Sequence, residues 1–296
     1  MERKQFLKTL SLLPLTGAAM NLSELTGIAS SFENTEAMPL LFLGHGSPMN
    51  AIEENEFTKG FRAISTRFEK PKAILCISAH WETRGTFVTA MEQPPTIHDF
   101  GGFPKALFDV QYPAPGSPEL AEMTKELIQS TEVGLTEKWG LDHGAWSVIK
   151  HLYPDADVPV IEMSIDYSKG PEFHYQLGKE LATLRRKGVL IIGSGNLVHN
   201  LRMVAWDKLE TPGFAFDWAQ EARSKMNTWI TEGDHQPLIS YQKQGKAFEL
   251  AIPTPDHFLP LLYVLGLKEA KDEISLFNDK AVGGSLTMTS VYISPA

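Results

Sequence analysis

Cysteine, long apolar runs and several familiar catalytic motifs are scarce or missing in this chain. Its 296 residues include one cysteine, Cys76, which excludes an intrachain disulfide, and the apolar run around it argues against a catalytic thiol. No phosphate-binding P-loop or His-Glu-x-x-His motif is present. Neither Ser47 nor Ser194 has the glycines two residues before and two residues after it that a nucleophile elbow needs. Gly193-Ser-Gly195 begins like a dinucleotide fingerprint, but Val198 replaces its third glycine.

Positive charge is also in short supply. The formal net charge of −9 argues against nucleic acid or an anionic membrane as the main partner. The hydrophobic content of 43% and the charged content of 21% are ordinary for a globular protein, and the length allows a large core. We find no internal repeat and no boundary that divides residues 39–296, so we expect a single folded domain there.

Residues 1–38 are expected to form an export-type leader and linker. A basic start, an apolar centre and small residues follow one another over residues 1–20, and the apolar run is too short for a membrane span. Arg3-Lys4 resembles the twin-arginine signal with lysine at the second position. This pattern predicts a periplasmic protein that leaves the cytoplasm folded. The alternative is a leader on a protein that stays in the cytoplasm.

Buried strands alternate with helices along the rest of the chain. Apolar runs predict strands, and helical spacing with N-cap and Pro signals predicts helices between them. This alternation indicates an α/β sandwich. We predict strands at 39–44, 73–77, 86–91, 158–163, 189–192 and 285–293, and helices at 51–68, from 117, from 173 to a stop at Gly188, at 217–231 and at 258–265.

Histidines recur next to the predicted strand ends and helix starts. They are His45, His80, His199 and His257, with His143 in a fifth turn of this kind. Open α/β sheets bind ligands beyond the carboxyl ends of their strands, and imidazole is a common ligand of zinc, iron, copper and nickel. Each histidine alone is compatible with a structural hydrogen bond. Their repetition predicts that at least two of them share a metal.

A long segment rich in aromatic residues, glycine and proline spans residues 93–116. Loops of this length are usually functional or disordered, and the aromatic residues favour a cover over a substrate. Within it, Asp99 follows His98 and is placed to orient it. His98 is either a substrate contact or a loop histidine with local hydrogen bonds. Phe103 either packs inside the protein or lines an aromatic pocket.

A series of short motifs resembles one known family. The chain from about Pro39 onward resembles the class III extradiol ring-cleavage dioxygenases, and most closely their 4,5-DOPA dioxygenase branch. The motifs occur in the same order as in that family: Gly44-His45-Gly-Ser-Pro48, Ser78-Ala-His80-Trp81, His98-Asp99-Phe100 with Gly102-Phe103-Pro104, Tyr112-Pro-Ala-Pro-Gly116, Leu141-Asp-His143-Gly144, Gly193-Ser-Gly-Asn196 with His199-Asn200, and Asp256-His257-Phe258.

The resemblance implies a single-domain α/β/α sandwich with a mixed central sheet. It also implies one divalent metal, Zn(II) or Fe(II), with His45 and His80 as ligands and with His199 and His257 completing or adjoining the metal site. Either His143 or His257 is the expected acid/base residue. Non-haem Fe(II) oxygenases typically add a carboxylate ligand, which the sequence does not identify.

By this reading the substrate is a small aromatic diol, cleaved with O2 to a muconate semialdehyde. His98, Asp99 and Phe103 are the candidate substrate-binding residues. Two other classes remain open: a zinc hydrolase that uses the same histidines, and a metal-binding protein without catalytic activity. The sequence predicts neither the particular catechol nor the oligomeric state.

Overall fold

Short apolar segments form one central sheet. The computed structural model describes residues 32–296. The strands β1 (Leu40–Gly44), β5 (Val160–Asp166) and β6 (Val189–Gly195) are buried along their whole length, and β2 (Ala73–Thr83) is buried over its first half. These four strands run parallel in the order β5-β2-β6-β1. Parallel strands covered on both faces are expected to be apolar throughout.

Antiparallel pairs make the eight-stranded sheet mixed. Its full order is β4-β3-β5-β2-β6-β1-β10-β7, with antiparallel pairing of β3 with β5, β10 with β1 and β7 with β10. A separate two-stranded sheet joins β8 and β9. The remaining strands are β3 (Thr86–Thr89), β4 (Val133–Thr136), β7 (Glu273–Phe277), β8 (Ala281–Val282), β9 (Leu286–Thr287) and β10 (Ser290–Ser294).

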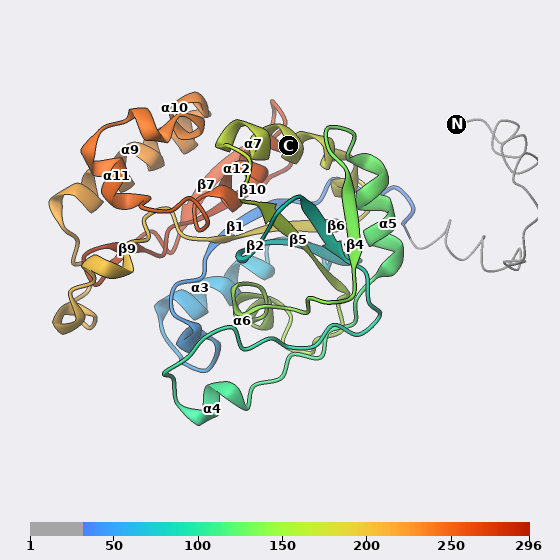
Figure 1. The fold of residues 1–296 in the computed structure, drawn as a ribbon, viewed down its shortest axis with the longest axis horizontal. Helices are drawn as coiled ribbons and strands as arrows, with labels where there is room; N and C mark the ends of the chain where they lie inside the picture. Colours follow the sequence, from blue (N-terminus) through green and yellow to red (C-terminus); the bar gives the residue numbers. More distant parts are fainter. Residues whose placement is uncertain (1–31) are drawn as a thin grey trace, which may run out of the picture. The chain divides into compact units, whose positions relative to one another are not determined.

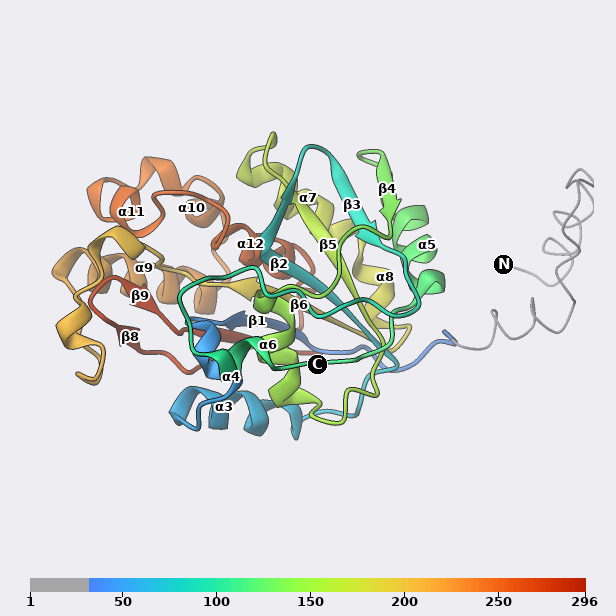
Figure 2. The same cartoon turned by 60° about the horizontal axis from the view of Figure 1, so that its bottom comes forward.

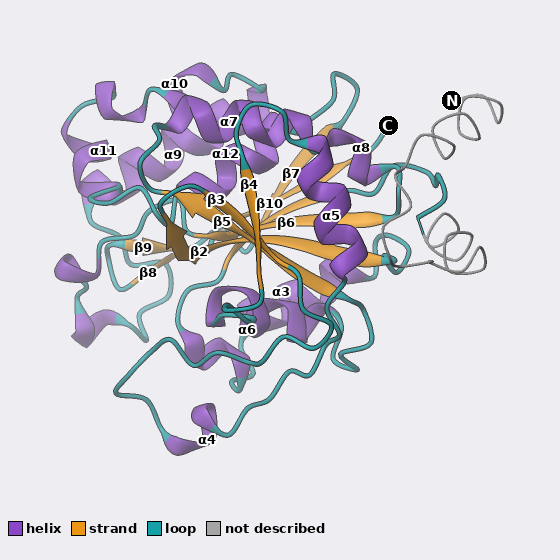
Figure 3. Cartoon of the chain, turned by 45° about the vertical axis from the view of Figure 1, so that its right-hand side comes forward, coloured by secondary structure: helices purple, strands orange, loops and turns teal. Residues whose placement is uncertain are grey.

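Helices cover both faces of the sheet. Figure 3 shows α3 and α6 on one side of the strands and α7, α12 and α9 to α11 on the other. The long connection between β3 and α5 carries α4 and runs past α6 (Figure 2). The helices are α3 (Glu56–Ser65), α4 (Lys105–Phe108), α5 (Pro118–Leu127), α6 (His143–Leu152), α7 (Pro171–Glu180), α8 (Ala182–Arg185), α9 (Asp217–Glu232), α10 (Gln236–Ile239), α11 (Lys246–Ala251) and α12 (Leu259–Gly266). The 3₁₀ turns are η1 (Pro48–Ala51), η2 (Leu201–Met203), η3 (Trp206–Lys208) and η4 (Tyr241–Lys243).

The predicted α/β/α sandwich with a mixed sheet is confirmed, although some boundaries differ. The strand that we expected to end at Ile77 continues to Thr83, because β2 pairs with β5 again after a register shift between Ile77 and Glu82. The predicted helix 51–68 is shorter. Asn55 accepts hydrogen bonds from the amides of Phe57 and Thr58 and so begins α3 at Glu56.

The predicted leader lies almost entirely outside the described residues, and the division between 1–38 and 39–296 stays a prediction. Within the described part, the amides of Thr35 and Met38 donate to the carbonyls of Arg186 and Arg185. The last residues before Pro39 are therefore hydrogen-bonded to the domain. Across residues 32–296, every helix is too short or too polar to span a bilayer.

Candidate metal centre and active site

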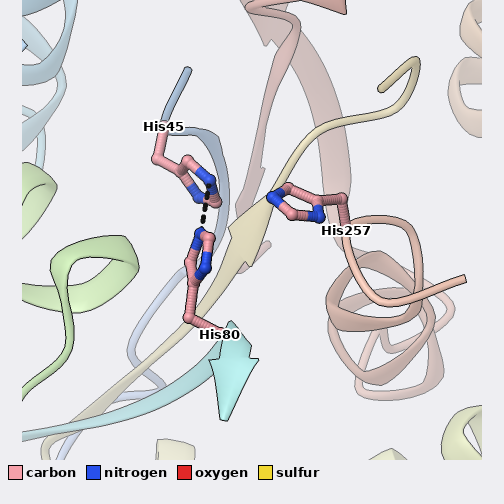
Figure 4. Close-up of side chains that lie close together, drawn as sticks. All are labelled: His45, His80 and His257. Carbon is pink, nitrogen blue, oxygen red and sulfur yellow. Dashed lines mark hydrogen bonds between the residues drawn. The ribbon is translucent and has the colours of Figure 1, made fainter. Parts of the chain in front are cut away.

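Two of the parallel strands bring His45 and His80 together. His45 follows β1 directly, His80 lies in β2, and β6 runs between these strands. The Nε2 atoms of the two imidazoles lie 3.2 Å apart (Figure 4). Two nitrogens that share a tetrahedral zinc ion at about 2.0–2.1 Å would be separated by about 3.3 Å. The distance therefore fits a shared metal ion.

The Nδ1 atom of His45 has a partner that fixes the tautomer. Ser194, in β6, donates its hydroxyl proton to the carbonyl of Gly144 at 2.5 Å. Its oxygen therefore accepts from Nδ1–H of His45, at 3.0 Å. This leaves a lone pair on Nε2 of His45, the nitrogen that faces His80. A hydrogen bond of this kind is the usual way in which proteins orient a metal-binding histidine.

His257 completes a group of three imidazoles. Its ligand nitrogen and those of His45 and His80 all lie within 4.8 Å of one another, and Figure 4 shows the three rings around a common space. Nδ1 of His257 is hydrogen-bonded to the carboxylate of Asp256. Nε2 of His257 is thereby left free for a metal. The group contains no carboxylate, so it differs from the two-histidine, one-carboxylate set of many Fe(II) oxygenases.

Burial keeps the first two imidazoles neutral. Desolvation, followed by the nearby His80 and His257, lowers the pKa of His45 well below its usual value. Desolvation and the neighbouring His143 and His257 lower the pKa of His80 to about 2. Only a neutral imidazole binds a metal. The two residues are therefore in the metal-binding form at neutral pH.

His143 opens α6 and is held by Asp99. One carboxylate oxygen of Asp99 accepts from the backbone N–H of His143 at 2.9 Å, and the other accepts from Nδ1–H at 2.8 Å. Burial raises the pKa of Asp99, but the hydrogen bonds from His143 outweigh this effect and lower it. The carboxylate is therefore ionised, and Nε2 of His143 is free to accept a proton. The ring centroid of His143 lies 3.8 Å from that of His80.

His199 adjoins the three-histidine group. Its ring is stacked on that of His257, with centroids 3.5 Å apart and planes at 8°. Its ligand nitrogen groups with Asp256 and His257, whereas the group of His45 and His80 does not include it. Desolvation and the neighbouring His257 lower the pKa of His199 to about 3. A ligand role for His199 stays a prediction.

The aromatic segment covers α6 next to His143. Phe100 contacts the His143 ring edge-to-face at 5.5 Å, and Phe103 contacts Phe100 at 5.5 Å. Trp146 in α6 donates its indole N–H to the carbonyl of Ile97 at 2.8 Å. The segment is therefore docked on the helix beside the histidines.

His98 and Asp99 have different partners within this segment. His98 donates Nε2–H to the carbonyl of Val110 at 2.9 Å and so ties the segment to itself. Asp99, which we expected to orient His98, is instead bonded to His143.

Sequence reasoning did not assign a role to Ser194 or Asp256. Ser194 was considered only as a nucleophile, and Asp256 only as a neighbour of His257. The available signal was the small residue pattern Gly193-Ser-Gly195, because a buried hydroxyl between two glycines needs a hydrogen-bond partner nearby.

The comparisons place the chain in one enzyme class. Residues 39–288 match the family described as the catalytic LigB subunit of aromatic ring-opening dioxygenase, and the chain belongs to this family. The predictions of the family and of an extradiol ring-opening dioxygenase are thereby confirmed. Enzymes of this family use a single metal. Among the described residues, three overlapping groups could hold one: His45 with His80 and His257, His80 with Asp99 and His143, and His199 with Asp256 and His257.

Particular relatives agree with this assignment. The chain is 48% identical over 260 residues to a protein of Escherichia coli named 4,5-DOPA dioxygenase extradiol, covering 86% of this chain and 94% of that one. It is 38% identical over 259 residues to the protein of that name in Beta vulgaris, covering 84% and 94% of the two chains. The crystal structure of the uncharacterized protein JW3007 from E. coli K12 matches with a TM-score of 0.73 at 40% identity, covering 87% of this chain and 100% of that one.

Proposed function

We propose that the protein cleaves a DOPA-like catechol with O2, in the extradiol manner, to a muconate semialdehyde. The group of His45, His80 and His257 is the observation that carries this proposal, because it offers three imidazole nitrogens to one metal, and burial lowers the pKa of two of these histidines, His45 and His80. The names of the relatives in E. coli and Beta vulgaris support the substrate class.

The proposed metal ligands are His45, His80 and His257. When bound there, Fe(II) or Zn(II) supplies a Lewis acid that lowers the pKa of the catechol hydroxyls, and only iron adds redox chemistry. Ser194 and Asp256 hold the first and the last of these imidazoles with Nε2 free.

His143 is the proposed acid/base residue. Asp99 accepts Nδ1–H of His143, so a proton from a catechol hydroxyl would pass to Nε2. The ionised carboxylate then stabilises the imidazolium that forms. His257, the other acid/base candidate, is assigned to the metal because its ring faces His45 and His80. His199 is stacked on His257, and its pKa of about 3 makes it a poor proton acceptor at neutral pH, so we give it no acid/base role.

The aromatic segment is the proposed substrate cover. Phe100 lies against the His143 ring and Phe103 lies against Phe100, where the two side chains would shield an aromatic substrate from water. Of the three residues predicted to bind substrate, Phe103 keeps that role in our proposal. Asp99 acts through His143, and His98 holds the segment in place through Val110.

The test is oxygen uptake by anaerobically prepared protein reconstituted with Fe(II) or with Zn(II), on addition of DOPA or another catechol. We expect uptake and a new yellow absorbance with Fe(II) and neither with Zn(II). His80→Ala should remove metal binding and activity together. A His80→Ala protein that keeps both would contradict the assignment.

The other two classes make different predictions in the same experiment. A zinc hydrolase would turn over substrate without O2, and a metal-binding protein would hold the metal without either reaction. Absence of oxygen uptake with both metals across several catechols would favour these classes.

We also propose that residues 1–38 direct export to the periplasm. The support is the basic, apolar and small-residue order of residues 1–20. Mass spectrometry of the protein from fractionated cells tests this proposal. A full-length chain recovered only from the cytoplasm would favour the alternative location.

A further inference from the structure

Two acidic side chains lie fully buried beneath the start of α6. Asp142 is the residue that caps this helix, and Glu162 lies within β5; both have a relative exposure of 0%. Acidic residues are almost never buried to this extent without a partner. The question is which hydrogen bonds their four oxygens make.

Two of the four oxygens accept hydrogen bonds from described donors. Oε1 of Glu162 accepts from the backbone N–H of Asp142 at 2.8 Å. Oδ1 of Asp142 accepts from the hydroxyl of Ser78 at 2.7 Å and from the backbone N–H of Ala145 at 3.1 Å. Oδ2 of Asp142 and Oε2 of Glu162 are both buried, and within residues 32–296 no group outside the pair donates a hydrogen bond to either oxygen.

The two side chains are themselves in hydrogen-bond contact. Ionisation of both carboxyl groups in this buried contact is opposed by the repulsion between the two negative charges and by the loss of hydration. The other ionisable neighbours are Asp99, Cys76, which pairs with Glu162 across β2 and β5, and His143. His143 is the one group among them that could carry a positive charge, and burial together with Asp99 outweighs its effect, so the pKa of Asp142 is raised. Desolvation, followed by Asp142, raises the pKa of Glu162 well above its usual value.

We propose that Asp142 and Glu162 share one proton, and that the neutral Glu162 is a positioning residue for the active site. The carboxylic acid of Glu162 donates to Asp142, whose carboxylate caps α6 and accepts from Ser78. All four oxygens of the pair are then satisfied without a second charge.

The pair connects the two halves of the catalytic centre. The hydroxyl oxygen of Ser78 also accepts from the backbone N–H of His80, at 3.2 Å. The residue after Asp142 is His143. Asp142 therefore links β2, which carries the proposed ligand His80, to α6, which carries the proposed acid/base residue His143. Glu162 fixes the position of Asp142 by accepting its backbone N–H.

The first test concerns the shared proton and needs no activity. Infrared spectroscopy of the folded protein at neutral pH should show the C=O band of a buried carboxylic acid, and Glu162→Gln should remove it. Asp166→Asn is the matched control, because Asp166 is a buried acid of the same strand whose hydrogen bonds with Ser168 lower its pKa against desolvation. That variant should leave the band unchanged. Absence of a band that depends on Glu162 would overturn the proposal.

The second test separates positioning from bulk stability. Gln reproduces a protonated Glu, since its amide donates to Asp142 and its carbonyl accepts from the Asp142 amide. Glu162→Gln should therefore keep kcat within about twofold, whereas Glu162→Met should lower kcat by about tenfold or more with little change in KM for the catechol. Equal losses in the two variants, or failure of Glu162→Gln to fold, would overturn the proposal.

This kinetic arm rests on the proposed function, whereas the infrared arm does not. If no catechol is turned over, the band and its loss in Glu162→Gln still decide whether the proton is shared.

Discussion

In two of the proposed metal ligands, the hydrogen bond made by Nδ1 determines which ring nitrogen is free to bind the metal. Nδ1 of His45 and Nδ1 of His257 are bonded to a hydroxyl and to a carboxylate, which leaves Nε2 of both rings free. A neutral hydroxyl and an ionised carboxylate make an imidazole basic to different degrees. The two ligands are therefore expected to respond differently when their partners are removed.

Replacing Ser194 with Ala should weaken metal binding. Without the hydroxyl, His45 loses the bond that fixes its tautomer, and loss of such partners typically lowers metal affinity by about 10- to 100-fold. Titration with Zn(II) against a competing chelator measures this effect. Thr124→Ala, which removes a buried hydroxyl from α5, is the control and should bind metal normally. An unchanged affinity in Ser194→Ala would refute the role of the hydroxyl.

Replacing Asp99 with Asn should affect catalysis more than metal binding. The amide would still accept from the backbone of His143, but the imidazolium that forms in the reaction would lose its counter-charge. A positioned acid/base residue contributes about 10²- to 10⁴-fold to a rate, and we expect kcat to fall within that range. Measurement of kcat alongside metal content checks this. Equal loss of metal and activity would mean that Asp99 supports the metal site instead.

At the scale of elements, alternate residues of β6 contact the helices on opposite faces of the sheet. A methyl group added to Gly193 would lie 2.5 Å from the carbonyl of Pro260, and one added to Gly195 would lie 2.1 Å from the carbonyl of His257. Ser194, between them, bonds to Gly144 on the α6 side. Because side chains alternate across a strand, the glycines admit the segment of His257 and α12 while the serine reaches His45.

Gly195→Ala should therefore displace His257. The new methyl group meets backbone, which cannot move aside cheaply, and overpacking of this kind costs about 1–3 kcal/mol. We expect a lower Tm and weaker metal binding, measured by calorimetry with and without Zn(II). Gly101→Ala is the matched control, because nothing lies within 4 Å of its added methyl group. A Gly195→Ala protein with the metal affinity of Gly101→Ala would show that α12 accommodates the change.

For the whole molecule, the sequence predicted which histidines lie at strand ends better than it predicted hydrogen bonds between side chains far apart in the chain. His45 and His80 could be expected to meet, because each lies at or beyond the end of an apolar run and parallel strands end at one edge. The pairing of Asp99 with His143 spans 44 residues, and adjacency in the sequence suggested His98 instead. The edge strand β7 was not predicted, since its residues are half-exposed and lack an apolar run.

The stability of the metal-free protein should fall in mild acid. The folded pKa values of His80 and His199 are lowered to about 2 and about 3, and that of His45 is also lowered, whereas an unfolded histidine titrates near 6.5. Below about pH 6.5 the unfolded chain takes up protons that the folded chain does not. The free energy of unfolding is therefore not reduced by these histidines above that pH, and it decreases as the pH falls further below it. Burial also lowers the pKa of His151, His174 and His235. The raised pKa values of Glu162, Asp142 and Glu82 act in the opposite direction, but these three acids are outnumbered by the six histidines.

Thermal unfolding of the metal-free protein between about pH 7 and pH 5 tests this balance. We expect Tm to decrease over this range, and we expect a shallower decrease in His80→Asn, which has one fewer buried imidazole. Glu162→Gln should show a steeper decrease than the wild type, because it removes a buried acid whose raised pKa opposes the effect of the histidines. A Tm that rises toward pH 5 in the wild type would mean that the buried histidines are charged in the fold, which would also argue against their binding a metal as neutral ligands.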